Sequence, residues 1–383
     1  MVFPTRNGTT WKHLQHHVHL GCFLRNLLVD SHAKAFHCRS KKERYNNLKI
    51  LASAYLNIFK PRWFESFRSI GVFLFLFFLV GSRPFAQSEN RLGYFEMEQS
   101  VQTPTGELYG TLTVPILKGT FPVALIIAGS GPTDRNGNNP QMKNNSLLLL
   151  AHELAAQGIA SLRYDKRGIG ASKDALISEE NLRFENYAED AKAWAAQLKA
   201  DSRFRKFIII GHSEGSLLGM LACEQADAFV SLAGAGRPID VILKEQLAAQ
   251  LSGQKKLLRA ANDGLSKLKE GKLVEDAPVE LFGLFRPSVQ PYMMSWMKYD
   301  PAVEISKLKI PVIIIQGTTD LQVKEEDARL LFMAYPLNSR LIIVEGMNHI
   351  LKLSPSDRQK NIETYSNPEL PLAEELCRAL GTL

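Results

Sequence analysis

The chain has 383 residues, of which 45% are hydrophobic and 22% are charged, so it can bury a core and does not have the composition of a disordered protein. Its net charge of +7 is unevenly distributed, since residues 1–88 hold 13 of the 46 Lys and Arg but 3 of the 39 Asp and Glu. The remainder is mildly acidic, which excludes the basic surface expected of a nucleic-acid-binding domain. The four cysteines have the spacing of neither a disulfide framework nor a zinc site.

A short apolar run near the N-terminus predicts export. Residues Ile70–Val80 (IGVFLFLFFLV) follow Arg62 and Arg68 and precede a polar stretch, which is the pattern of a secretory signal. The run is short for a membrane span, which needs about 20 residues. Pro84 disfavours cleavage after Ala86, so an uncleaved anchor is the alternative.

These features divide the chain into three parts. Residues 1–61 are expected to be an upstream presequence or a misassigned start, and residues 62–87 a signal peptide or N-terminal anchor. Residues 88–383 then form the domain, exported to the periplasm, the extracellular space or the envelope. Membrane contact is expected only through the signal or anchor.

After residue 90, apolar runs alternate with segments of helical spacing. Runs without polar alternation are typical of strands buried on both faces of a parallel sheet. The predicted strands are 123–128, 160–164, 207–210, 229–233, 312–315 and 341–344. The predicted helices are 146–157, 187–199, 215–224, 325–334 and a last one starting at Pro371. This order predicts an α/β fold with a doubly wound, mostly parallel sheet.

The alternation is interrupted by a long insertion at residues 236–308. Residues 241–268 have helical apolar spacing, and residues 292–296 are rich in Met and aromatic residues. An insertion at the C-terminal edge of the sheet would lie over the ligand crevice, so we predict a helical cap in which Met294 and Trp296 contact substrate. A packing segment without a role in the site is the alternative.

The motif with the clearest chemistry is Gly211-His212-Ser213-Glu214-Gly215, directly after an apolar strand. A serine at a sharp strand-to-helix turn projects its hydroxyl out of the sheet, and the flanking glycines allow the tight turn. Ser213 is therefore the predicted nucleophile.

A serine nucleophile needs a base and an acid that orients the base. Three histidines follow the apolar run: His152 lies within a predicted helix and His212 is next to the nucleophile, which leaves His349. His349 comes just after a predicted strand, where an α/β fold places its site. His212 is expected to point elsewhere, and His152 to be structural. Asp320 follows the preceding strand and lies between serine and histidine in chain order, as this kind of site requires. The predicted triad is Ser213, Asp320 and His349.

A tetrahedral intermediate needs two backbone N–H donors. The N–H of Glu214 at the start of the following helix is one candidate. The other lies in the Gly-rich loop after residue 128, where we expect Ser130, with Gly131 as the alternative. Arg135 in this loop is expected either to pair with Asp134 or to contact substrate.

Five motifs together carry a family resemblance: GSGPTDRNGN (129–138), YDKRGIGAS (164–172), GHSEG (211–215), QGTTDLQV (316–323) and GMNHIL (346–351). From about residue 95 onward the chain resembles the α/β-hydrolase superfamily, and within it bacterial serine aminopeptidase-like and prolyl oligopeptidase-related hydrolases, many of them regarded as esterases. The resemblance implies an α/β-hydrolase fold and makes 164–172 a structural turn without a catalytic role for Asp165 or Arg167. Ala128 replaces a histidine that is frequent in such loops, which removes a side chain that can brace the oxyanion loop.

Three functions are compatible with these residues. The favoured one is a serine hydrolase that cleaves carboxylic esters of small or medium substrates through an acyl-enzyme. A peptidase with the same triad would also need a carboxylate for the substrate ammonium, such as Glu214 or Glu304. An inactive binding module is the third. The expected partner is a small ester or a short peptide, and no metal or other cofactor is implied.

Overall fold

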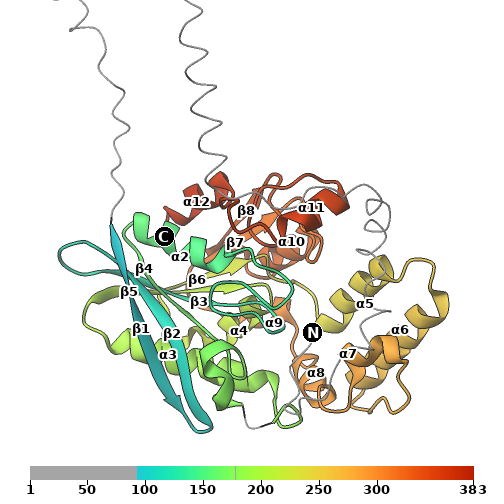
Figure 1. Cartoon of the computed structure of the whole chain (residues 1–383). Helices are drawn as coiled ribbons and strands as arrows, with labels where there is room; N and C mark the ends of the chain where they lie inside the picture. The colour runs from blue at the N-terminus through green and yellow to red at the C-terminus, as the bar shows by residue number, and fades with distance from the viewer. Residues whose placement is uncertain (1–92, 177) are drawn as a thin grey trace, which may run out of the picture. The chain divides into compact units, whose positions relative to one another are not determined.

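The computed structural model describes residues 93–176 and 178–383. They contain one eight-stranded sheet with helices packed on it (Figure 1). The strand order is β1-β2-β4-β3-β5-β6-β7-β8, with β1 and β2 antiparallel at one edge and parallel pairing from β4 to β8. The strands are β1 (Tyr94–Thr103), β2 (Gly106–Pro115), β3 (Phe121–Ile127), β4 (Ala160–Tyr164), β5 (Phe204–His212), β6 (Ala228–Leu232), β7 (Val312–Gly317) and β8 (Ser339–Val344). The predicted mostly parallel sheet is confirmed. The predictions for residues 1–61 and 62–87 lie outside the described residues.

Helices connect the strands and cover both faces of the sheet. They are α2 (Ser146–Ala156), α3 (Phe184–Ala200), α4 (Glu214–Ala222), α5 (Ile239–Gln250), α6 (Lys255–Lys269), α7 (Phe282–Phe285), α8 (Gln290–Trp296), α9 (Pro301–Ser306), α10 (Glu325–Ala334), α11 (Arg358–Thr364) and α12 (Glu374–Leu380). None of the helices in the described ranges has the length and apolar character needed to cross a bilayer.

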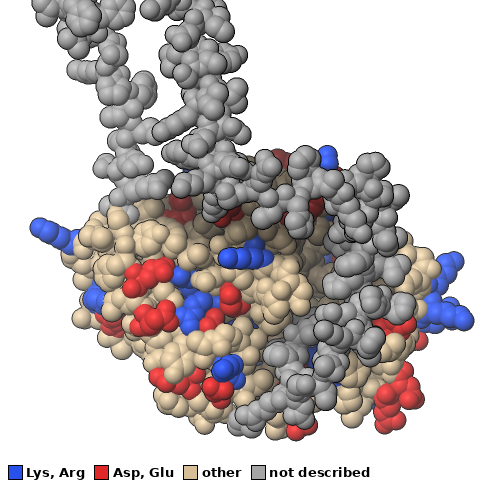
Figure 2. Space-filling view, viewed as in Figure 1, with Lys and Arg blue, Asp and Glu red and all other residues tan. Residues whose placement is uncertain are grey.

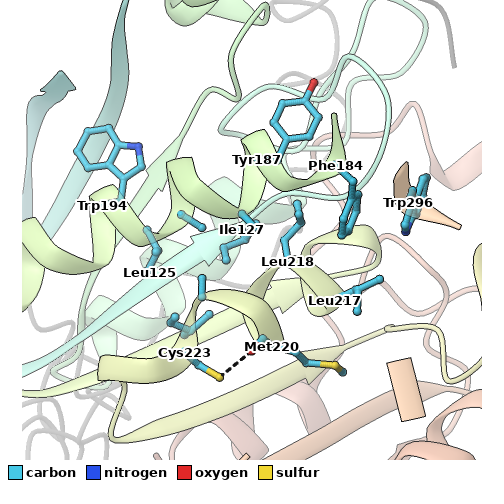
Figure 3. Packing of buried hydrophobic residues seen from close by; sticks show 14 of the residues in the cluster. Leu125, Ile127, Phe184, Tyr187, Trp194, Leu217, Leu218, Met220, Cys223 and Trp296 are labelled. Atoms are coloured by element: carbon cyan, nitrogen blue, oxygen red, sulfur yellow. Dashed lines mark hydrogen bonds between the residues drawn. The ribbon is translucent and has the colours of Figure 1, made fainter. Parts of the chain in front are cut away.

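The alternation of side chains along β3 shows why both faces need helices. Leu125 and Ile127 belong to a core with apolar residues of α3 and α4, whereas Ala124 and Ile126 belong to a second core with residues of α2 and α12. Successive side chains of a strand point to opposite faces, so an apolar strand requires cover on both sides. Figure 3 shows the first core, in which Trp194 and its neighbours on α3 lie over the sheet.

The insertion between β6 and β7 contains α5 to α9, and Figure 1 shows α5, α6, α7 and α8 grouped at one side of the domain. It is attached to the rest by aromatic stacking, since the rings of Trp296 on α8 and Phe184 on α3 are 5.4 Å apart and nearly parallel (Figure 3). Both side chains are buried. Buried aromatic pairs of this kind stabilise an interface beyond the area they cover, so α8 is held firmly on α3.

Three features differ from the expectations drawn from the sequence. The hairpin β1–β2 is not among the predicted strands, because both of its strands alternate apolar with polar residues, such as Phe95, Met97 and Val101 on β1, and contain no continuous apolar run. The helical spacing at 241–268 forms two helices, separated by a turn at Gly253 with a positive φ of 85°. The last helix starts at Glu374 and not at Pro371.

Candidate active site

Ser213 lies between the last residue of β5 and the first residue of α4, with φ 56° and ψ −120°. The glycines around it are needed because the backbone is crowded. A Cβ at Gly211 would lie 2.2 Å from the carbonyl oxygen of Gly215, and one at Gly215 would lie 2.2 Å from that of Ile127. These positions exclude any side chain, and the turn projects the Ser213 hydroxyl from the end of the strand.

The structure brings the three predicted triad residues together. His349, in the loop after β8, has its Nε2 3.0 Å from Ser213 Oγ, and its Nδ1 is 2.8 Å from Asp320 Oδ2 in the loop after β7. An ionised carboxylate only accepts hydrogen bonds, so Nδ1–H donates to Asp320 and leaves Nε2 to accept from the serine hydroxyl. This is the arrangement that activates a serine for nucleophilic attack.

Asp320 is held in its ionised form by its neighbours. Its Oδ1 accepts from the backbone N–H of Gln322 at 2.7 Å and of Val323 at 3.0 Å, and its Oδ2 accepts from the Gln316 amide at 3.0 Å. Burial raises the pKa of the Asp320 carboxyl, but the His349 ring and the backbone donors more than offset it and leave the pKa below its usual value.

The two other histidines have different positions. The His212 ring does not face Ser213, and its Nε2 donates to the backbone carbonyl of His349 at 2.8 Å. Burial, together with the nearby His349, lowers the pKa of His212 to about 4, so the ring is neutral at pH 7. His212 therefore holds the backbone of the base, which the sequence did not indicate. His152 stacks on Tyr94 and lies 3.1 Å from Glu96, outside the triad.

The Gly-rich loop after β3 lies directly against the nucleophile. A Cβ at Gly129 would be 3.1 Å from the Cβ of Ser213. Ser130 and Glu214 line the same cavity as Ser213, and the N–H of Glu214 begins α4, where a helix leaves its first N–H groups without acceptors. Gly131, the alternative donor, does not line this cavity. The use of the Ser130 and Glu214 amides as the oxyanion hole remains a prediction.

The cavity at Ser213 has a volume of about 60 Å³ and a largely apolar wall. Its apolar lining residues are Leu217, Ala235, Ile239, Ile242, Leu243, Trp296, Pro301 and Val323. Most of these belong to the insertion, so the insertion forms one side of the cavity. Its cationic lining residue, Arg237, is bound by Asp327 at 2.8 Å and Glu245 at 2.7 Å.

Of the three predicted substrate contacts, one lines this cavity. Trp296 does, whereas Met294 is partly buried against the hydrophobic core and is not a lining residue. The Arg135 guanidinium is bound by Asp165 at 2.9 Å and by Glu98 at 2.7 Å, also away from the cavity lining.

The residues that the structure describes contain no group of three or more His, Cys, Asp or Glu side chains that could hold a metal ion.

The mostly parallel sheet, the serine at the β5–α4 turn and the chain order of serine, aspartate and histidine define the class of the fold: the chain has the α/β-hydrolase fold. Residues 144–272 match the family model Hydrolase_4, described as serine aminopeptidase, S33.

A curated relative of the chain is an esterase. Esterase EstD of Thermotoga maritima is 29% identical over 254 residues, which cover 64% of this chain and 58% of the relative, so the chain spans less than two thirds of that relative's length. Among solved structures, the esterase Pf2001 of Pyrococcus furiosus matches with a TM-score of 0.50 at 16% identity, over 76% of this chain and 91% of that one. Est1E of Butyrivibrio proteoclasticus matches with a TM-score of 0.48 at 16% identity, over 74% and 96% of the two chains.

Proposed function

We propose that the chain is a serine hydrolase that cleaves carboxylic esters of small substrates through an acyl-enzyme. His349 removes the proton of Ser213, whose Oγ attacks the ester carbonyl, and the resulting oxyanion faces the amides of Ser130 and Glu214. His349 then gives its proton to the departing alcohol, and water hydrolyses the acyl-enzyme by the same steps. The observation that carries the proposal is the hydrogen-bonded chain from Ser213 through His349 to Asp320 beside an apolar cavity.

The occupied carboxylates near the cavity favour an ester over a peptide with a free N-terminus. Glu214 is the one carboxylate among the residues lining the cavity, and it already accepts a hydrogen bond from Tyr292 and lies 3.6 Å from Lys166 Nζ. Glu304, the other candidate, is paired with Lys307 at 2.7 Å. A substrate ammonium would thus have to displace the existing partner of either carboxylate, and burying an unpaired charge is costly. The description of EstD as an esterase supports the same choice.

A peptidase is the second candidate, favoured by the description of the matching family model. One assay separates the two functions. The purified protein is given p-nitrophenyl esters from acetate to octanoate and, in parallel, aminoacyl p-nitroanilides. We expect hydrolysis of the short esters and none of the anilides. A kcat/KM for an anilide equal to or above that for the best ester would overturn the ester assignment in favour of the peptidase.

We further propose that the enzyme acts outside the cytoplasm. The support is the apolar run at residues 70–80 with its basic N-terminal flank, both of which precede the described residues.

A further inference from the structure

A buried lysine lies behind the loop that contains Ser130. Lys166 is 1% exposed, and its Nζ donates to the carbonyl oxygen of Gly129 at 2.6 Å. The ammonium also lies 5.0 Å from the centre of the Tyr187 ring, and Glu214 Oε2 is 3.6 Å away. A buried charge is costly unless it is paired and hydrogen-bonded, so this position requires a reason.

The geometry of the peptide bond links this contact to the active site. The C=O of Gly129 and the N–H of Ser130 belong to one planar trans peptide and point in opposite directions. A charge-assisted hydrogen bond on the carbonyl therefore fixes the direction of the N–H on the other side. The N–H of Ser130 therefore points away from the buried Lys166. Ser130 itself lines the cavity that contains Ser213.

The second predicted oxyanion donor is connected to the same ammonium. Glu214 supplies its backbone N–H at the start of α4, while its buried carboxylate lies beside Lys166. That carboxylate also accepts a hydrogen bond from the hydroxyl of Tyr292, a buried residue of α8 in the insertion. One network thus joins the residues of both amides to the 236–308 insertion.

We propose that Lys166 is a positioning residue that orients the two oxyanion-hole amides, and that Tyr292 connects this orientation to the insertion. The proposal rests on the serine-hydrolase function proposed above. It gives the stretch 164–172 a defined task, and it supplies a brace for the loop in which Ala128 provides none. The hydrogen bond between Lys166 and Gly129 joins residues 37 positions apart in the sequence.

The main test is Lys166→Met in the full-length protein, which keeps most of the side-chain length and removes the ammonium. Oxyanion donors act in the transition state, and loss of one costs about 10²–10³ in kcat. We expect kcat to fall by about 10², with KM changed less than about threefold. The affinity for a trifluoromethyl ketone, which forms a tetrahedral adduct with the serine, should fall by the same factor as kcat/KM.

A double variant separates positioning from stability. Lys166→Met alone leaves the Glu214 carboxylate buried without its cation, which can unfold the protein. Lys166→Met/Glu214→Gln removes both charges, and the introduced amide oxygen can still accept the Tyr292 hydroxyl. We expect the double variant to recover the wild-type Tm but not kcat, because the Gly129 carbonyl still lacks its donor. Recovery of both Tm and kcat would overturn the proposal.

A matched pair of substitutions tests the connection to the insertion. Tyr292→Phe removes the hydroxyl bound to Glu214, and we expect kcat to fall about three- to tenfold. Tyr299→Phe is the control, since its hydroxyl donates to Glu185 at 3.1 Å outside the network, and kcat should not change. Equal effects of the two would contradict the connection. Failure of the proposed function looks different: the wild type itself would then neither turn over esters nor bind the ketone.

Discussion

The backbone of Ser213 stores strain that the surrounding hydrogen bonds maintain. A non-glycine residue with φ 56° costs about 1–3 kcal/mol. The N–H of Ser213 donates to the carbonyl of Leu232 on the neighbouring strand at 2.9 Å, and its own carbonyl accepts from Ser216 N at 2.9 Å. These two bonds fix the turn from both sides, so the hydroxyl stays within reach of His349 without rearrangement.

Substitutions of the base and the acid should differ in severity. We expect His349→Ala to lower kcat by about 10⁶, as removal of the nucleophile would, because the two residues act as a unit. Asp320→Asn should lower kcat by about 10⁴, since the imidazole loses its orientation but the oxyanion hole remains. Steady-state kinetics on a p-nitrophenyl ester measures both. His152→Ala is the control and should leave kcat unchanged; a harmless His349→Ala would mean that the base is misassigned.

His212 should make folding sensitive to mild acid. Its pKa is lowered to about 4 by burial and by His349, against 6.5 for the free side chain, so the unfolded chain binds the proton more readily. The free energy of unfolding therefore includes a contribution from neutral His212 that is complete above pH 6.5 and is lost as the pH falls toward 4. At pH 5 the loss amounts to about 2 kcal/mol. Urea unfolding at pH 7.5 and pH 5 should show this loss in the wild type. His212→Gln keeps a donor for the His349 carbonyl and should show a loss smaller by that amount; an identical pH dependence would refute the assignment.

At the residue level, the sequence identified the side chains whose place follows from a motif or a strand end. Ser213, Asp320 and His349 are of this kind, and the structure places them within hydrogen-bonding distance of one another. The contacts of His212 and Lys166 could not be predicted. Both depend on where a side chain points relative to a loop distant in the sequence, and no local pattern encodes that.

Among the elements, α5 contributes Ile239, Ile242, Leu243 and Gln246 to the lining of the cavity. Leu243 on α5 lines the cavity and is partly buried, whereas Met294 on α8 packs against the core outside the lining. We expect Leu243→Ala to enlarge the acyl site and raise the kcat/KM ratio of octanoate over acetate by about tenfold. Met294→Ala should leave this ratio unchanged. Ester series of graded chain length measure both, and a shift with Met294→Ala alone would show that the acyl group lies elsewhere.

The elements differ in how well the sequence predicts them. The buried parallel strands were identified within a few residues, because a short apolar run between helical segments is typical of a strand covered on both faces. The β1–β2 hairpin was missed, since its strands alternate apolar with polar residues and contain no continuous apolar run of the kind that indicates the parallel strands. The helices of the insertion were only partly resolved, because helical spacing continues across the turn between α5 and α6 that Gly253 makes possible.

The surface of the whole domain carries charges of both signs. Figure 2 shows Lys and Arg interspersed with Asp and Glu on the visible face. Exposed side chains of opposite charge also form ion pairs, such as Lys192–Glu189 and Lys199–Asp227. On the part of this face that is not covered, Lys and Arg do not form the continuous basic stripe that attracts a phosphate backbone. A small neutral ester, in contrast, needs no electrostatic guidance to reach the cavity.

The export proposal applies to the whole chain. We expect the protein to leave the cytoplasm and its mature form to begin near Gln87, because residues 62–87 have the order of a secretory signal. Cell fractionation followed by N-terminal sequencing measures both. Arg62→Glu/Arg68→Glu should retain the protein in the cytoplasm by removing the basic flank. Soluble cytoplasmic protein with residues 1–60 intact would contradict the proposal and leave the chemistry unaffected.

The most direct measurement for the proposed function compares the wild type with Ser213→Ala on p-nitrophenyl acetate. We expect turnover by the wild type and a kcat lower by about 10⁶ in the variant, which should keep the wild-type Tm because only the hydroxyl is removed. A fluorophosphonate should label the wild type at Ser213 and leave the variant unlabelled. Retention of a tenth of the wild-type kcat by a folded Ser213→Ala variant would show that Ser213 is not the nucleophile.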